Sequence, residues 1–292
     1  MVLHAKITMT SYKVVLVTGS SSGIGLETSL LLAREGYITY ASMRDISRSK
    51  KILEISRDGY INLKPIEMDV TDDKSVKDGI VKILENDGRI DIVINNAGND
   101  ILGAVEDLSI QEFKDQFETN FYGVIRVIKE TLPIMRNQNE GIIINVSSIG
   151  GRTGIPLNSA YISSKFALEG FTETLRYETG EYGIRIHLVE PGIVKTSFFE
   201  NAKFAKNISN SIYKKLMQNL FEGFIPLLKN NYSLPIQVAE LILKIIKNEN
   251  SDFRNVIGHD AIEILKAKNN LSHKEFEKWM VESLFDKKGF IR

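Results

Sequence analysis

Tyr161 and Lys165 stand four residues apart in a segment with the residue pattern of a helix. Positions i and i+4 share one helix face, so the phenol and the ammonium would lie side by side. A free phenol has a pKa of about 10, and a nearby ammonium lowers it by stabilising the phenolate. The pair therefore indicates an acid/base catalyst, although such a pair alone is also a common surface feature.

Two further polar residues have the chemistry to join this pair. Ser148 comes just after a strand-like run that ends at Val146, and its hydroxyl could hydrogen-bond a reacting carbonyl oxygen. Asn120 falls among apolar residues of another helical segment, and a buried amide needs a partner. A structural hydrogen bond to the backbone explains Asn120 equally well.

A glycine-rich loop joins the first predicted strand, Lys13–Thr18, to the first predicted helix, Gly25–Glu35. Glycines at this junction let the backbone approach a pyrophosphate, which the amides at the helix N-terminus then bind. The alternative is a glycine-rich turn without a ligand. The predicted dinucleotide contacts in this loop are Gly19, Ser21, Ser22, Gly23, Ile24 and Gly25.

The end of the second predicted strand, Tyr37–Met43, bears on cofactor choice. A carboxylate there would bind the adenosine ribose and repel a 2′-phosphate, but Ser42 supplies none. Arg44 offers a guanidinium suited to phosphate, and strand geometry would put it on the same face as Ser42. We therefore expect NADP rather than NAD, the alternative being that Arg44 is only a solvated surface residue.

Short β-rich runs alternate with helical patterns as far as about residue 195. This alternation predicts parallel βαβ units, and hence an α/β fold with a Rossmann-type doubly wound sheet and helices on both faces. The further strands are predicted at Asn62–Met68, Ile90–Ile94, Ile142–Val146, Ile184–Val189 and Phe253–Ile257. The further helices are predicted at Asp72–Asn86, from Ser109 through Phe113–Met135, and at Ser159–Thr179.

Composition excludes several classes of function. The 292 residues include 37 basic and 37 acidic residues, so no basic excess indicates nucleic-acid binding. The chain has no cysteine, which excludes disulfides and thiol chemistry and fits a cytoplasmic location. No apolar run is long enough for a signal peptide or a membrane span. No metal is expected, because the four histidines are far apart in the sequence: His4, His187, His259 and His273.

Taken together, these motifs resemble the short-chain dehydrogenase/reductase family, in its subgroup with a Thr-Gly-x-x-x-Gly-x-Gly loop. The matches run over residues 13–197 in the family's order and spacing. They are Thr18–Gly25, Asp69, Asn95–Gly98, Asn120, Ser148, Tyr161, Lys165 and Pro191–Thr196.

The resemblance implies a role for each catalytic residue. Tyr161 would exchange the proton, Ser148 would polarise the carbonyl, and Lys165 would hold the nicotinamide ribose and lower the pKa of Tyr161. Asn120 would hold a water in a proton relay to Lys165. Further cofactor contacts are implied at Asp69 and Val70 for adenine, at Asn96, Ala97 and Gly98 near the adjacent ribose, and at Val194 and Thr196 for the carboxamide.

The rest of the chain extends this single predicted domain, 1–292, beyond its core of 13–197. Residues 198–235 are the family's substrate-covering segment, and their apolar content favours a lipophilic ketone or alcohol, although a helix that only packs on the domain is equally possible. Residues 236–292 form a helical C-terminal extension with an apolar stripe, as in steroid- and retinol-dehydrogenase-like members. The extension could close the site, form an interface or dock on its own core. The family also implies a homodimer or homotetramer.

We therefore expect an NADP-dependent carbonyl reductase or alcohol dehydrogenase. A non-catalytic dinucleotide-binding redox sensor is the alternative, but a sensor would not need the complete catalytic set. Nucleotide-sugar epimerases and dehydratases usually have a different glycine spacing from Gly19, Gly23 and Gly25.

Overall fold

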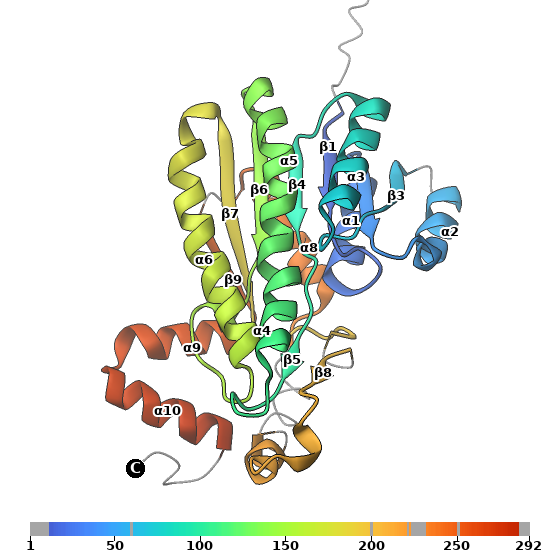
Figure 1. The fold of residues 1–292 in the computed structure, drawn as a ribbon. Helices are drawn as coiled ribbons and strands as arrows, with labels where there is room; N and C mark the ends of the chain where they lie inside the picture. Colours follow the sequence, from blue (N-terminus) through green and yellow to red (C-terminus); the bar gives the residue numbers. More distant parts are fainter. Residues whose placement is uncertain are drawn as a thin grey trace, which may run out of the picture.

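The central sheet of the computed structural model, which describes residues 12–58, 61–198, 201–220, 222, 232–249 and 252–285, has seven parallel strands. Their spatial order is β3-β2-β1-β4-β6-β7-β9, so the direction of winding reverses between β1 and β4. This confirms the predicted doubly wound sheet (Figure 1). The strands are β1 (Val14–Val17), β2 (Ile38–Met43), β3 (Leu63–Glu67), β4 (Ile92–Asn95), β6 (Gly141–Val146), β7 (Ile184–Pro191) and β9 (Arg254–Ile257).

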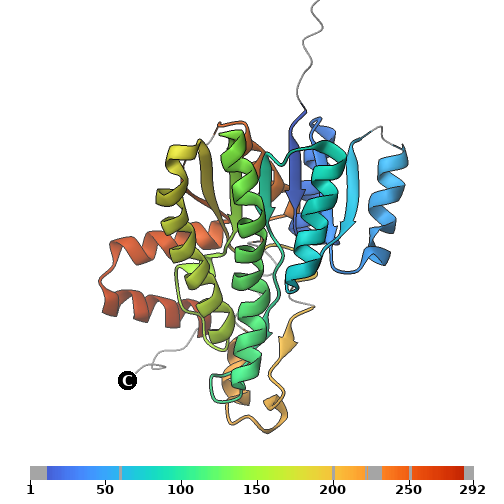
Figure 2. The same ribbon diagram turned by 45° about the horizontal axis from the view of Figure 1, so that its top comes forward.

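Helices cover both faces of the sheet, as Figure 2 shows. One face packs against α3 (Asp73–Asp87), α5 (Gly123–Gln138) and α6 (Ser159–Thr179). The other face packs against α1 (Gly23–Arg34) and α8 (Pro235–Ile246). Because β1, β4 and β6 are buried on both faces, they read as continuous Val and Ile runs, which is why the sequence predicts them well. A short helix that the sequence analysis did not predict, α2 (Lys50–Asp58), packs on α1.

The long helix predicted from Ser109 is interrupted. Its capping box is confirmed, because the Ser109 amide donates to Glu112 Oε2 (2.8 Å) and the Glu112 amide to Ser109 Oγ (3.2 Å). After α4 (Ile110–Phe117), however, the backbone makes a π-helical turn over Glu118–Tyr122 before α5 begins. This turn contains Asn120, and such turns frequently occur at functional sites.

Beyond β7, the helical spacing of apolar residues corresponds to a helix only in part. Two short strands, β5 (Ile101–Leu102) and β8 (Lys203–Phe204), pair in parallel, and a 3-10 turn follows at Ile208–Asn210. Residues 214–220 are helical, and Leu216, Met217 and Leu220 of this helix pack on a common cluster. Four members of the predicted pattern, Phe199, Phe221, Phe224 and Ile225, lie outside the described residues.

The C-terminal extension docks on its own chain. It comprises α9 (His259–Asn270) and α10 (His273–Phe285), seen at the lower left of Figure 1. The apolar stripe of α10, apart from Leu284, whose side chain is outside the described residues, packs on the segment before it in the chain. The resulting cluster contains Ala104, Leu157, Tyr213, Leu216, Met217, Leu220, Phe276, Trp279 and Met280. None of the described helices is long and apolar enough to cross a membrane.

Candidate active site

The residues predicted to do chemistry meet at one edge of the sheet, where β1, β4, β6 and β7 end. In a doubly wound sheet this is the edge where ligands bind, at the point where the strand order reverses. Thr18 follows β1, Asn96 follows β4, Ser148 lies just beyond β6, and Pro191 ends β7. The topology therefore brings together segments that are far apart in the sequence.

The glycine loop has the shape of a phosphate cradle. Gly19 and Gly23 take positive φ values of +69° and +58°, which side chains rarely adopt. At Gly25, a Cβ would overlap the Gly19 carbonyl oxygen and the Asn96 amide. Ser22 precedes α1 but makes no side-chain cap, so the first amides of this helix have no capping side chain. These features fit the pyrophosphate of a dinucleotide.

The side chains of Thr18 and Asn96 hold this loop in place through hydrogen bonds. The amides of Asn96 and Ala97 both donate to Thr18 Oγ1 at 3.0 Å. Asn96 Nδ2 donates to the carbonyls of Thr18 (2.9 Å) and Gly19 (3.1 Å). The side chain of Asn96 thus fixes the loop, a role that the sequence analysis did not predict, while its predicted cofactor contact remains a prediction.

The loop after β7 lies opposite the glycine loop. The position of a Cβ on Gly23 would be 3.2 Å from Thr196 Cγ2, so the two loops approach each other closely. Val194 is buried and bridges to Ser233, and the Ile193 amide donates to Asp260 Oδ2 at 2.7 Å. The two predicted carboxamide contacts are therefore held next to the cradle.

At the adenine end, the structure corrects one position. Ser42 is fully buried in the sheet and its carbonyl accepts from the Ser20 amide (2.8 Å), so its hydroxyl does not reach a ribose site. Because β2 ends at Met43, the strand geometry that would pair Ser42 with Arg44 does not extend that far. Arg44 is exposed just beyond the strand, and the next carboxylate, Asp45, accepts from the Ser47 amide at 3.0 Å.

The predicted adenine contacts lie just beyond β3. Asp69 Oδ1 accepts from the amide and the hydroxyl of Thr71, at 2.9 and 2.8 Å, so this carboxylate shapes its own turn. Val70 is buried, and a Cβ on Gly123 at the start of α5 would overlap it. Both residues therefore border the same edge of the sheet as the glycine loop.

The three predicted catalytic side chains are brought together on β6 and α6. The Ser148 hydroxyl lies close enough to Tyr161 to lower the pKa of its phenol, and Ser148 Oγ accepts from the Gly150 amide at 3.0 Å. Lys165 is buried, with Nζ 5.7 Å from the centre of the Tyr161 ring and donating to the Val146 carbonyl at 2.9 Å.

The pKa of Tyr161 differs from the prediction. Burial raises this pKa, the nearby Ser148 hydroxyl lowers it, and the charge of Asp100 raises it further. The predicted lowering by Lys165 is wrong for the protein alone, because Lys165 Nζ donates to a carbonyl and burial has the largest effect. Burial likewise lowers the pKa of Lys165 to about 8, against the opposing charges of Glu169 and Asp100. Tyr161 is therefore protonated at neutral pH, as a proton donor must be.

Asn120 is fully buried, and its amide connects the π-helical turn to the loop after β4. Its Oδ1 accepts from the Asn99 amide (3.0 Å), and its Nδ2 donates to the Asn99 carbonyl (3.1 Å) and to Ser164 Oγ (3.2 Å). This is the structural role that the sequence left open. Its place in a proton relay remains a prediction.

Asp100 and Asn158 also border the site, and the sequence analysis did not select them. Asp100 is buried and its charge acts on both Tyr161 and Lys165. Asn158 precedes α6 and donates from Nδ2 to Asp100 Oδ2 at 3.4 Å. One indication of a role at the site was available from the sequence: Asp100 lies two residues after Gly98, and Asn158 lies three residues before Tyr161.

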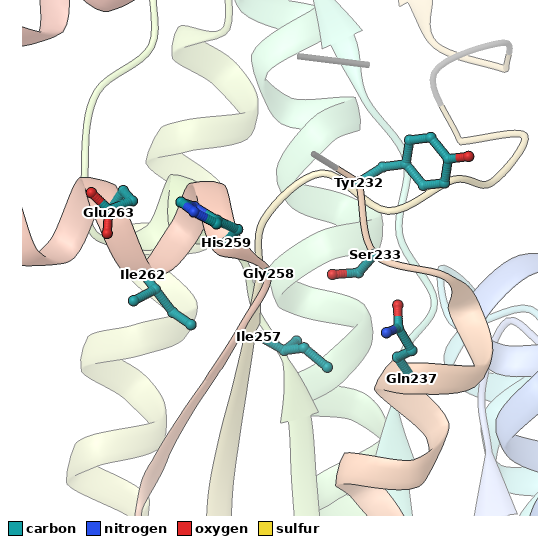
Figure 3. A pocket seen from close by; sticks show the side chains of 8 residues that line it. All are labelled: Tyr232, Ser233, Gln237, Ile257, Gly258, His259, Ile262 and Glu263. Carbon is teal, nitrogen blue, oxygen red and sulfur yellow. The ribbon is translucent and has the colours of Figure 1, made fainter. Parts of the chain in front are cut away.

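A separate pocket of about 500 Å³ lies where β9 ends and α8 and α9 begin. Figure 3 shows its lining side chains, which include Tyr232, Gln237 and His259 but none of the predicted catalytic residues. Its Ser233 contacts the loop after β7 through a hydrogen bond to the Ile193 carbonyl (2.8 Å). The pocket therefore adjoins the cofactor loop and is not the catalytic centre.

Comparison with known proteins agrees with this arrangement. The family model described as short chain dehydrogenase matches residues 13–207, and the chain belongs to this family of oxidoreductases. It is 35% identical to 3-ketodihydrosphingosine reductase of Bacteroides thetaiotaomicron, covering 88% of this chain and 91% of the relative. It is 36% identical to retinol dehydrogenase 8 of Bos taurus, covering 80% and 78%.

Two solved structures are similar over most of their length. A short-chain dehydrogenase from Streptomyces avermitilis superposes with a TM-score of 0.79 at 29% identity, covering 93% of this chain and 98% of the other. An alcohol dehydrogenase from the archaeon Thermococcus sibiricus, complexed with 5-hydroxy-NADP, has a TM-score of 0.70 at 26% identity, covering 85% and 96%.

Proposed function

We propose that this chain is an NADP(H)-dependent carbonyl reductase or alcohol dehydrogenase that interconverts a lipophilic ketone and its secondary alcohol. The observation that carries the proposal is the grouping of Tyr161 with Ser148 and with the buried Lys165, whose Nζ lies 5.7 Å from the centre of the Tyr161 ring, at the ligand-binding edge of the sheet. The bound nicotinamide would supply or accept the hydride.

The residues of this chain would divide the remaining work. In the direction of reduction, Tyr161 donates a proton to the carbonyl oxygen, while Ser148 holds that oxygen by a hydrogen bond. Lys165 binds the nicotinamide ribose, and Asn120 holds a water on the path that returns the proton. In oxidation, Tyr161 accepts the proton.

NADP rather than NAD is supported by the end of β2. Arg44 is the exposed cation there, and the carboxylate of Asp45 is already engaged with Ser47. A 2′-phosphate could therefore pair with the Arg44 guanidinium, and the charged Asp45 carboxylate next to it would reduce the strength of that pairing. The similar alcohol dehydrogenase was solved with an NADP derivative, which points the same way.

A lipophilic substrate is supported by the surroundings of Tyr161. The Phe198 ring lies 6.0 Å from the Tyr161 ring, centre to centre. Leu157, four residues before Tyr161, belongs to the apolar cluster formed with α10 and residues 213–220. Two relatives are named for lipophilic substrates, retinol and 3-ketodihydrosphingosine.

The competing proposal, a redox sensor without turnover, is disfavoured by this geometry. Cofactor binding alone would not require a tyrosine and a serine placed together at the nicotinamide end of the site. The absence of cysteine supports a cytoplasmic location.

The test is Tyr161→Phe, assayed with NADPH and a panel of aliphatic and aromatic ketones. We expect kcat to fall by at least ~10²-fold, as for loss of general acid catalysis, with NADPH affinity nearly unchanged. The matched control is Tyr177→Phe, which changes an exposed tyrosine on the same helix and should be silent. Near wild-type turnover by Tyr161→Phe would show that another group donates the proton.

A further inference from the structure

Three polar atoms beside the catalytic tyrosine are buried without a partner. Asp100 is 2% exposed, and its Oδ1 has no hydrogen-bond partner among the residues that the structure describes. The same is true of Asn158 Oδ1 and of Ser159 Oγ. The side chains of Asp100 and Asn158 are neighbours, since Asn158 Nδ2 donates to the other Asp100 oxygen at 3.4 Å, and Ser159 follows Asn158 in the chain.

Such a cluster is costly unless something else binds to it. A buried carboxylate needs a cation or several hydrogen bonds. A buried acceptor without a partner has lost its hydrogen bonds to water and has gained none in the protein. Asp100 forms no ion pair with any described lysine or arginine, and the nearby Lys165 donates to the Val146 carbonyl. Burial raises the pKa of Asp100 only to about 6, so it is mainly ionised at pH 7.5.

The position of the cluster identifies it as part of the substrate site. Asn158 immediately precedes α6 and lies three residues before Tyr161, about one helical turn away along the chain. The main chain of Asp100 accepts from the Lys203 amide at 2.9 Å, which places it beneath β8. Leu157, the residue before Asn158, belongs to the apolar cluster with α10.

The unpaired atoms also select the chemistry of the ligand. Asp100 Oδ1 and Asn158 Oδ1 are acceptors only, and Ser159 adds a hydroxyl. A primary ammonium has three donors, no acceptor and a positive charge that complements the Asp100 carboxylate. An alcohol could form hydrogen bonds to these atoms but would not neutralise the carboxylate.

We propose that Asp100, Asn158 and Ser159 form a subsite for the cationic amino group of the substrate, and therefore that the substrate is a lipophilic amino ketone or the corresponding amino alcohol. This inference rests on the proposed function. A spacing of one helical turn from Tyr161 places the ammonium one or two carbons from the carbonyl, while the apolar chain runs toward Leu157 and α10.

The experiment compares 1-aminooctan-2-one with octan-2-one, at pH 7.5 and saturating NADPH. The wild-type enzyme should favour the amino ketone in kcat/KM by at least ~10-fold, the value of one charge-assisted hydrogen bond. Asp100→Asn keeps the shape but removes the charge. Because the Asp100 charge also acts on Tyr161 and Lys165, this change can alter the rate with both ketones, but it should lower the ratio of kcat/KM for the amino ketone to that for octan-2-one by ~10- to 100-fold. Asp115→Asn, an exposed change on α4, is the matched control.

Equal wild-type use of both ketones, or an equal effect of Asp100→Asn on both, would overturn the subsite and leave the proposed function standing. Should neither ketone be reduced, the proposed function fails for these substrates, and binding decides about the subsite. Octylamine should then bind the wild-type NADP⁺ complex at least ~10-fold more tightly than octan-1-ol. That comparison uses only the wild type, so it still tests the subsite in the case that Asp100→Asn does not fold. Equal affinities would refute the proposal.

Discussion

Replacing Arg44 with alanine removes the cation that we expect to bind the 2′-phosphate of NADP. Arg44 follows β2 directly and is exposed, so its guanidinium could reach a phosphate without strain. The adjacent carboxylate of Asp45 accepts from the amide and hydroxyl of Ser47 but stays charged, so it reduces what Arg44 contributes to phosphate binding. NADH lacks the phosphate, so its affinity should hardly change.

The size of the effect follows from the exposure of Arg44. A well-formed contact between a guanidinium and a phosphate contributes roughly 1.5–3 kcal/mol, which corresponds to about 10- to 100-fold in affinity. Because Arg44 is solvated, we expect the lower part of this range. Salt screens such a contact, so the preference of the wild type for NADPH should shrink between about 0.05 and 0.5 M salt.

The assay is a fluorescence titration of NADPH and NADH against the wild type and Arg44→Ala. The matched control is Arg34→Ala, because Arg34 is also exposed but lies at the far end of α1 from the glycine loop. We expect Arg44→Ala to weaken NADPH binding about tenfold, with Arg34→Ala silent. Equal wild-type affinities for the two cofactors, or an unchanged NADPH affinity in Arg44→Ala, would show that Arg44 is only a surface charge.

Three further predictions concern the loop, the core and assembly. Gly25→Ala should weaken NADPH binding at least ~10-fold in the same titration, because its Cβ would overlap the Gly19 carbonyl, whereas Gly79→Ala, which meets mainly the flexible end of Met68, should not. Burial raises the pKa of Glu169 from 4.5 to about 7. The unfolded chain therefore releases this proton first, and stability falls as pH rises through this window. Relative to Glu169→Gln, the free energy of unfolding of the wild type in urea should fall as the pH rises from 4.5 to 7.5. Light scattering should show a homodimer or homotetramer at tens of micromolar, and a monomer would contradict this.

Local sequence determines most of this fold. Each central strand is buried on both faces and must be apolar throughout, and each crossover helix presents one apolar face, so both leave readable patterns. The segment after β7 is less regular, because its helical spacing corresponds to a helix at residues 214–220 but not before them. A pattern of period 3.6 can then arise without a helix, as at Phe204, which lies in β8.

The catalytic set could be predicted because its members are tied to element ends. Ser148 follows β6, and Tyr161 and Lys165 share one face of α6, so spacing alone indicates their juxtaposition. Ser42 shows the limit of such reasoning. Its position near the end of a strand was predictable, but whether the side chain turns into the core or toward a ligand depends on where β2 ends and what packs on it.

Asp100 and Asn158 show a second limit, which is the contact between distant residues. They are separated by 58 positions, and although each lies close to a motif residue, Gly98 or Tyr161, nothing in the sequence pairs the two. Only the folded chain shows that they share a hydrogen bond and that the Asp100 charge acts on both Tyr161 and Lys165. That charge raises both pKa values, so it favours a protonated donor and a charged lysine at the same time. A cation bound at Asp100 would offset both effects, so amine recognition and proton transfer should be coupled through this one carboxylate.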